Sequence, residues 1–275
     1  MPNTFRIGDL DVLVVSDGFI KFPAPVYYRG TTAEQWEPHK RWLDHEGNLE
    51  FPMACFLVRA GETRVLIDTG LGPLSLWQFK GGALLPELAS AGVQPEDIDV
   101  VFLTHLHIDH CGTCIVEQGG APQPVFPNAV YRWTADEHAH WKQSPQPPGS
   151  TFSVPAMLEA LEGRFEAADG GASIGPGVSV IATPGHTPGH AGVVLSSGSA
   201  RAYILGDAIS CPVQLEETEW SGLGDVDAKL ARRTQEAVAR EIESSSALLA
   251  TAHFPGLTFG RVLRGEGKRY LQPVS

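Results

Sequence analysis

The chain has 275 residues, of which 43% are hydrophobic and 19% are charged, a composition that can bury a sizeable core and differs from that of a disordered chain. Its 32 acidic and 20 basic side chains give a formal net charge of −12. This charge argues against a nucleic-acid partner, whose phosphates require a basic surface, and against an anionic membrane surface. We expect a small-molecule or protein partner instead.

The N-terminal residues show no basic cluster followed by an apolar run, because Asp9, Asp11 and Asp17 interrupt the one candidate segment. That pattern argues against a signal peptide. Apolar segments also stay well below the ~20 residues that span a bilayer. We therefore expect a cytoplasmic protein without membrane contact.

Short runs rich in Val, Ile and Leu, bounded by Gly, Pro or Asp, predict β-strands. In chain order they cover residues 10–16, 54–60, 63–70, 99–105, 178–184, 191–197 and 200–207. Helical patterns lie between them, at 74–91, 134–142, 153–163 and 227–246. The last has the clearest apolar stripe, and Asp227 is its expected N-cap. Hairpin-like strand pairs mixed with strand–helix alternation predict an α/β (α+β) fold in which helices cover the sheets.

Residues 1–275 show no domain boundary, so we expect a single domain. Residues 18–28, GFIKFPAPVYY, are apolar and aromatic, but Pro23 and Pro25 argue against a central strand. The segment is therefore predicted to be a loop. Its rings would be buried against the core, in a homodimer contact or over the site.

Residues with metal-binding side chains are concentrated directly after the apolar run 99–105. They are His105, His107, Asp109 and His110. Because alternate residues of an extended backbone point the same way, His105, His107 and Asp109 are expected to converge, with His110 turning away. Four such side chains exceed what one tetrahedral ion takes from one segment. The spacing suits two neighbouring ions.

Three more metal-binding residues follow apolar runs later in the chain. His186 lies in TPGHTPGH, Asp207 ends the run ARAYILGD, and His253 follows ALLATA. Each stands at or just past the end of an apolar strand-like run, so all three could meet the first four residues at one edge of the sheets.

These motifs resemble those of the metallo-β-lactamase superfamily, whose hallmark is an HxHxDH segment followed by a His, an Asp and a His. SDG, LIDTGLG, FPNAV, LGD and HFPG also match in order. The resemblance implies a four-layer αββα sandwich, with two mixed sheets covered by outer helices and the metals at one edge. It also implies a division of seven ligands between two metals: His105, His107 and His186 on the first, Asp109, His110 and His253 on the second, and Asp207 bridging both. His190, the second His of TPGHTPGH, matches a position outside this ligand set, so we expect it to support the site without ligating.

Imidazole and carboxylate ligands suit two divalent ions, for which we expect zinc, with Mn, Fe or Co as alternatives. Two such ions about 3.5–4 Å apart can share a water and lower its pKa toward ~7. The predicted reaction is metal-assisted hydrolysis. Asp207 would take part as the bridge, and Asp109 could also relay a proton to the leaving group.

Within the superfamily, the chain is similar to the group that holds the N-acyl-homoserine-lactone lactonases, which act in quorum quenching, and the methyl-parathion-hydrolase-like phosphotriesterases. Those lactonases typically carry a Tyr three residues after the bridging Asp, where this chain has Ser210. We expect an enzyme that acts on ester bonds, with a metal-bridging hydroxide opening a lactone or cleaving an ester of a small apolar substrate. Phosphotriester hydrolysis is the alternative. From other classes, a catalytically silent metal-binding protein and a diiron oxidoreductase stay open.

A substrate pocket needs apolar walls, and several side chains near the motifs could supply them. Core packing is the other common role of aromatic residues. The candidates are Phe19, Phe22, Tyr27, Trp133, Trp141 and Ser210.

Overall fold

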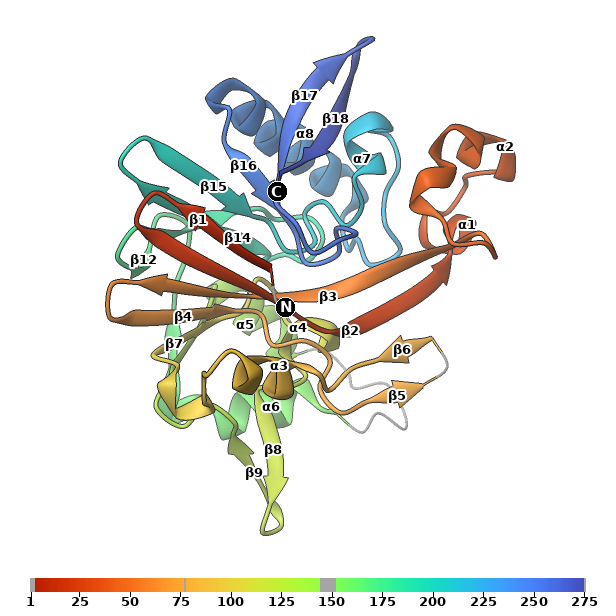
Figure 1. Cartoon of the computed structure of the whole chain (residues 1–275). Helices are drawn as coiled ribbons and strands as arrows, with labels where there is room; N and C mark the ends of the chain where they lie inside the picture. The colour runs from red at the N-terminus through yellow and green to blue at the C-terminus, as the bar shows by residue number, and fades with distance from the viewer. Residues whose placement is uncertain (1–2, 77, 144–151, 275) are drawn as a thin grey trace.

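The computed structural model describes residues 3–76, 78–143 and 152–274. Two β-sheets face each other, and helices cover their outer sides (Figure 1). This arrangement confirms the predicted four-layer αββα sandwich.

The first sheet has the strand order β11-β10-β7-β4-β3-β2-β6-β5, with β1 paired to β2. Its parallel pairs join β4, β7, β10 and β11, and its other pairs are antiparallel. The strands are β1 (Asn3–Ile7), β2 (Leu10–Pro23), β3 (Asn48–Ala60), β4 (Thr63–Ile67), β5 (Ser75–Leu76), β6 (Phe79–Lys80), β7 (Val100–Phe102), β10 (Val130–Trp133) and β11 (Phe165–Ala167).

The second sheet runs in sequence order from β12 to β18. Its strands are β12 (Ser173–Gly175), β13 (Val178–Ala182), β14 (Ala191–Ser197), β15 (Ala200–Ile204), β16 (Leu248–Ala250), β17 (Gly260–Gly265) and β18 (Lys268–Pro273). A separate hairpin of β8 (Ile115–Gln118) and β9 (Ala121–Pro124) projects from the body in Figure 1.

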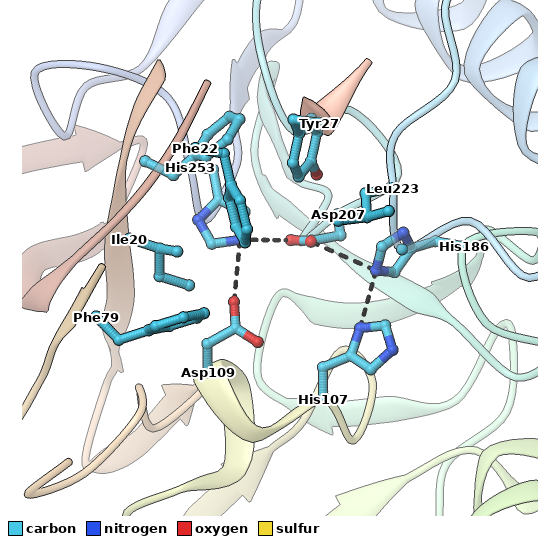
Figure 2. Close-up of a pocket in the computed structure, with 12 residues that line it drawn as sticks. Ile20, Phe22, Tyr27, Phe79, His107, Asp109, His186, Asp207, Leu223 and His253 are labelled. Carbon is cyan, nitrogen blue, oxygen red and sulfur yellow. Dashed lines mark hydrogen bonds and ion pairs between the residues drawn. The ribbon is translucent and has the colours of Figure 1, made fainter. Parts of the chain in front are cut away.

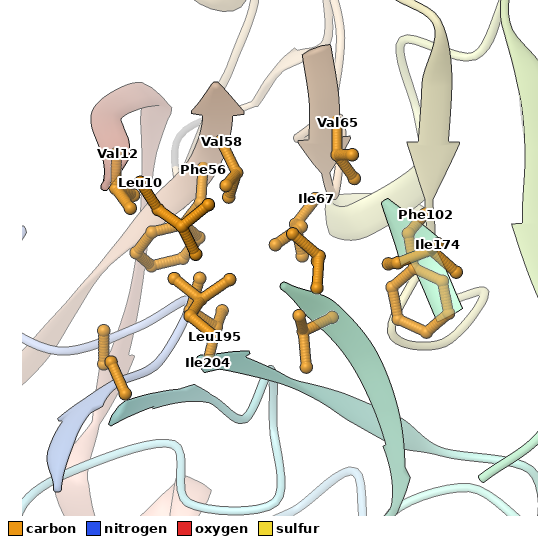
Figure 3. Close-up of a cluster of buried hydrophobic side chains, with 14 of the residues drawn as sticks. Leu10, Val12, Phe56, Val58, Val65, Ile67, Phe102, Ile174, Leu195 and Ile204 are labelled. Atoms are coloured by element: carbon orange, nitrogen blue, oxygen red, sulfur yellow. The ribbon is translucent and has the colours of Figure 1, made fainter. Parts of the chain in front are cut away.

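The core between the sheets is apolar, with Val12 and Phe56 of the first sheet facing the same cluster as Leu195 of the second (Figure 3). On the outer faces, Leu84 of α3 packs on the first sheet and Ile242 of α8 packs on the second. Burial of these side chains on both faces of each sheet stabilises the layers.

The helices are α1 (Ala24–Tyr27), α2 (Ala33–Trp36), α3 (Leu84–Ser90), α4 (Ile108–Cys111), α5 (Ala135–Lys142), α6 (Val154–Ala160), α7 (Val213–Glu216) and α8 (Ala228–Ser245), with 3₁₀ turns at η1 (Glu37–Trp42), η2 (Pro95–Asp97) and η3 (Glu162–Arg164). The predicted N-cap of α8 is confirmed, since the Asp227 carboxylate accepts the Leu230 N–H. Within the described residues, none of the helices has the length and apolar character needed to cross a bilayer.

The helix predicted over 74–91 is less than half the expected length. Its first part instead holds the paired strands β5 and β6, and the helix begins only at Leu84. Gly82 lies between them with φ of +96°, a left-handed conformation that favours glycine and ends the apolar periodicity on which the prediction relied.

The loop predicted over 18–28 was wrong. Residues up to Pro23 continue β2, which pairs with β3 after a register shift between Ser16 and Phe19. Pro23 is the last residue of the strand and Pro25 lies in the first turn of α1, two positions where proline is tolerated. Because strand residues alternate between faces, Ile20 and Phe22 share one face and Phe19 points to the other.

The buried carboxylate of Asp17 ties together two loops beside the site. Its Oδ2 accepts the N–H groups of Leu71 and Gly72 at 2.8 and 3.0 Å, and its Oδ1 accepts those of Gly82 and Leu84 at 3.1 and 2.8 Å. A carboxylate can accept all four bonds, which neither an amide nor a hydroxyl can do.

The loop that Asp17 holds supports α4 in turn. Gly112, which follows α4, donates its N–H to the carbonyl of Gly70 at 2.8 Å. A Cβ on Gly72 would lie 2.6 Å from the Gly112 carbonyl oxygen, so the two backbones are in direct contact. Asp17 therefore contributes to the placement of the residues on α4.

Replacing Asp17 with Ala should lower the free energy of unfolding by at least about 3 kcal/mol, because four buried N–H groups lose their acceptor. Asp17→Asn is the matched control: its single carboxamide oxygen keeps part of the set, so it should lose less. Urea unfolding followed by circular dichroism measures both. Equal stability of Asp17→Ala and the wild type would contradict this role.

Candidate metal centre

Five of the seven predicted ligand residues lie in loops that follow strands, and Asp109 and His110 lie on α4. The structure brings all seven together, and Figure 2 shows five of them around one cavity: His107, Asp109, His186, Asp207 and His253. His105 and His107 follow β7 of the first sheet. His186, Asp207 and His253 follow β13, β15 and β16 of the second.

The extended backbone predicted through 105–109 ends at His107, which is the N-cap of α4. Asp109 and His110 are therefore neighbours on a helical turn. The expectation that Asp109 converges with His105 and His107 was wrong: Asp109 and His110 share a group with His253 instead.

The first group joins His105, His107 and His186. Nδ1 of His107 lies 2.9 Å from Nε2 of His105 and 3.0 Å from Nε2 of His186. Burial lowers the pKa of His105 well below its ordinary value and lowers that of His107 to about 3. Neutral imidazoles at this spacing present lone pairs to a common point, as a cation site requires.

The second group joins Asp109, His110 and His253. Oδ2 of Asp109 lies 3.5 Å from Nε2 of His110 and 3.4 Å from Nε2 of His253. Burial opposes charge at His253, but the carboxylates of Asp207 and Asp109 raise the pKa of His253 to about 10. In the protein alone, protons on this group balance the carboxylates, and a metal that binds here would displace them.

Asp207 lies between the two groups. Its Oδ1 is 3.2 Å from Nε2 of His110 and 3.2 Å from Nε2 of His253, while its Oδ2 is 3.4 Å from Nε2 of His186. Each carboxylate oxygen thus faces a different group (Figure 2). A carboxylate placed in this way could contact a cation on each side.

Two buried polar atoms at the centre test whether the residues fit a metal. Nε2 of His110 and Oδ1 of Asp207 are buried and lie 3.2 Å apart, but neither makes a hydrogen bond of good geometry among the described residues. A buried polar atom without a partner costs about 1–3 kcal/mol. Cations between the groups would satisfy both atoms, so the donor set fits two metal ions.

The far side of four of the five imidazoles is also fixed. Nδ1 of His110 lies 2.9 Å from Oδ2 of Asp68, a residue with φ of +59°. The other partners are the Thr104 hydroxyl for His105, Asp225 for His186 and the Pro52 carbonyl for His253. Such contacts orient the rings that bind a metal.

His190 supports Asp207, as expected from the sequence. Its Nε2 accepts the backbone N–H of Asp207 at 3.0 Å, and its Nδ1 lies 2.8 Å from the Thr183 hydroxyl. Burial lowers the pKa of His190 well below its ordinary value, so the ring is neutral and Nε2 can accept.

A cavity of about 160 Å³ opens beside the two groups. One side carries the candidate ligands His107, Asp109, His186, Asp207 and His253, and the other is lined by Ile20, Phe22, Tyr27, Phe51, Phe79, Leu223 and Gly224. The aromatic rings contact one another: Tyr27 lies 4.5 Å from Phe51, and Phe22 meets Phe79 edge-on at 5.9 Å between centroids. The wall is therefore apolar and continuous (Figure 2).

Of the six predicted pocket residues, only Phe22 and Tyr27 line this cavity. Phe19 lies on the opposite face of β2, between the ammonium groups of Lys21 and Lys80. Trp133 is fully buried in the core, where it stacks on Phe165.

Trp141 and Ser210 lie close to the site without lining the cavity. Trp141 donates its indole N–H to Glu137 at 2.6 Å and meets the His107 ring edge-on. Ser210 is buried, and its N–H is donated to Gln214 at 2.8 Å.

Five lining residues were missed: Ile20, Phe51, Phe79, Leu223 and Gly224. Ile20 could have been found from strand alternation with Phe22 if residues 18–23 had been assigned to a strand. The others carry no local signal, because ordinary apolar residues in separate segments become neighbours only through the fold.

A family model described as "Metallo-beta-lactamase superfamily" matches residues 50–253, more than half of the chain. The chain therefore belongs to this superfamily. The match includes all seven candidate ligands.

Individual relatives point to the lactonase group. An N-acyl homoserine lactonase from a Bacillus species is 25% identical over 214 residues, covering 70% of this chain and 79% of that protein. The solved structure of AbOPH, a hydrolase in the beta lactamase superfamily, is 27% identical with a TM-score of 0.85, covering 100% of this chain and 97% of that chain. AidC, a dizinc quorum-quenching lactonase in complex with a product, has a TM-score of 0.89 at 24% identity with the same coverage; at that identity the likeness shows the fold.

Replacing Asp207 with Ala should reduce the bound metal from about two ions per chain to one or fewer, because adjacent cations lose the carboxylate between them. Mass spectrometry of metal content after dialysis measures this. The exposed Asp136, changed to Ala, is the matched control and should keep the wild-type content. Two ions retained at unchanged affinity in Asp207→Ala would exclude the bridging role.

Proposed function

We propose that the protein is a zinc-dependent hydrolase that opens a lactone or cleaves an ester of a small apolar substrate. The composition of the cavity carries this proposal: metal-binding residues form one side and apolar side chains the other. Among the described residues that line it, none is Lys or Arg, so the cavity favours an uncharged substrate. The lactonase relatives support a lactone as the substrate class.

The proposed ligands are those that the sequence indicated. Asp207 is the proposed bridge between the group that contains His105 and the group that contains His253. Imidazole-rich sets of this kind suit zinc, with Mn, Fe and Co as the alternatives to be separated by metal analysis. When bound, the two ions would supply a nucleophilic water at neutral pH and a Lewis acid for the carbonyl oxygen.

Asp109 is the proposed proton carrier. It lines the cavity, and its Oδ2 faces His110 and His253. Burial would raise its pKa, but these two imidazoles hold the pKa of Asp109 below its ordinary value. The carboxylate is therefore ionised at neutral pH and can accept a proton. We propose that it takes the proton that the attacking water gives up and passes it to the leaving oxygen.

Tyr27 is the proposed hydrogen-bond donor to the substrate. Its pKa is raised well above its ordinary value by burial and by the charge of Asp207, while a hydrogen bond with Ser210 acts in the opposite sense. The phenol therefore stays protonated. Ser210 stands where the lactonases that the sequence resembles carry a Tyr, so here a phenol reaches the site from α1 instead.

The metal-loaded protein should hydrolyse acyl lactones with kcat/KM at least about 100-fold above that for phosphotriesters, a difference of about 2.7 kcal/mol in barrier. A chelator should abolish the activity, and added zinc should restore it. Parallel assays on both substrate classes test this directly.

Each other result supports an alternative. Faster hydrolysis of phosphotriesters would replace the lactonase assignment with the phosphotriesterase one. Two bound zinc ions without hydrolysis of either class would indicate a catalytically silent protein. Bound iron with oxygen uptake would indicate a diiron oxidoreductase.

Tyr27→Phe should lower kcat/KM for the lactone about tenfold, the value of one neutral hydrogen bond of about 1.4 kcal/mol. Metal content should not change. Tyr203→Phe is the matched control, because the Tyr203 hydroxyl bonds Glu241 at 2.5 Å on the outer side of the second sheet. Wild-type kinetics in Tyr27→Phe would remove the phenol from the mechanism.

The cytoplasmic location and the homodimer stay predictions. Size-exclusion chromatography with light scattering would test the second. The 18–28 segment is less available for a dimer contact than the sequence suggested, because Ile20, Phe22 and Tyr27 line the cavity.

A further inference from the structure

Residues 220–225, WSGLGD, form a strap between α7 and α8 that passes over His186. Its first residue is anchored in an aromatic cluster. The Trp220 ring lies 4.8 Å from Trp36 and 5.8 Å from Tyr28, measured between centroids. Both of these rings are buried, so the start of the strap is held firmly.

The end of the strap is bonded to the loop that carries His186. Val226 donates its N–H to the carbonyl of His186 at 3.0 Å, and Asp227 donates its N–H to Gly185 at 2.9 Å. A Cβ on Gly185 would lie 2.3 Å from the Ala231 nitrogen. The His186 loop, the strap and the start of α8 are thus packed backbone against backbone.

Asp225 uses both of its oxygens within this arrangement. Oδ1 lies 3.0 Å from Nδ1 of His186, and Oδ2 accepts the N–H of Gly222 at 2.9 Å. The side chain of Asp225 is only 4% exposed. A buried carboxylate at this distance fixes the proton on Nδ1, which leaves the lone pair on Nε2.

Gly224 confines the same imidazole from its edge. A Cβ on Gly224 would lie 2.6 Å from Cε1 of His186 and 3.6 Å from Cε1 of His107. Real Cβ atoms do not come so close, so a side chain here would displace the His186 ring. The strap therefore limits both the rotation and the tautomer of His186.

We infer that Asp225 is a positioning residue for His186. Its bond to Nδ1, together with the contact of Gly224 against the ring, directs Nε2 of His186 toward the point shared with His107 and Asp207. Carboxylate partners of metal-binding imidazoles raise ligand basicity and fix ring orientation, and their loss costs about 10–100-fold in metal affinity. The inference rests on the proposed metal centre and not on the choice of substrate.

A purely structural role for Asp225 gives a different expectation. If the carboxylate only tied the turn to Gly222, its removal would loosen the strap and leave the affinity of the His105–His107–His186 group unchanged. Asp225→Asn helps to separate the two roles, because its one carboxamide oxygen can replace only one of the two bonds.

Stepwise zinc binding in competition with a chelator, without substrate, tests the inference. Asp225→Ala should lower the zinc affinity of one of the two sites about 10–100-fold and change the affinity of the other less than threefold. The affinity of Asp225→Asn should lie between those of Asp225→Ala and the wild type. Glu219→Ala is the matched control: this strap-flanking side chain is 85% exposed and pairs with Arg232. It should bind both ions as the wild type does.

Two further readouts keep the test decisive if Asp225→Ala folds poorly. Gly224→Ala keeps the Asp225 carboxylate but should weaken the same zinc site, because the added methyl group displaces the His186 ring. In the wild type, nuclear magnetic resonance should show a slowly exchanging Nδ1–H signal from His186, which Asp225→Ala should lose. Wild-type zinc affinities in both variants would overturn the inference. Because no substrate is used, an inactive protein can still give either result.

Discussion

The carboxylate of Asp207 sets the constraint on which the molecule depends, because its two oxygens must reach imidazoles that belong to different sheets. Oδ1 faces His110, from the first sheet, and Oδ2 faces His186, from the second. Neither sheet alone can build this centre. The apolar core between the sheets therefore has a functional consequence, since it fixes the distance at which the strand ends meet.

Placing so many ionisable groups in a buried space is unfavourable unless each has a partner. The structure meets this requirement with carboxylates that contact the far ring nitrogens of the candidate ligands: Asp68 at Nδ1 of His110 and Asp225 at Nδ1 of His186. The loops that carry these groups are fixed by backbone contacts too close for side chains, as at Gly112 and Gly185. Cations would complete the balance at the atoms that protein groups leave without a bond.

The chemistry could be predicted from the sequence because its residue types are rare and their order is specific: seven candidate ligands, the supporting His190 and the αββα layers all follow from motifs. The local geometry could not. Alternation along an extended strand failed at Asp109 because the chain turns into a helix at Ile108. Pro23 does not exclude a strand, contrary to the prediction from the sequence, because it is the last residue of β2. The pocket walls were mostly missed, since residues such as Phe79 and Leu223 are ordinary apolar side chains.

This contrast follows from how the two parts of the site are built. The ligands come from strand ends and short turns whose positions the sandwich dictates. Much of the apolar wall comes from segments that the sandwich does not need: α1 lies between β2 and β3, and Leu223 lies between α7 and α8. Within the strap, Leu223 forms part of the cavity wall, and Asp225, two residues later, bonds the imidazole of His186. A change in the strap that reshapes the cavity therefore also acts on the position of the His186 ring.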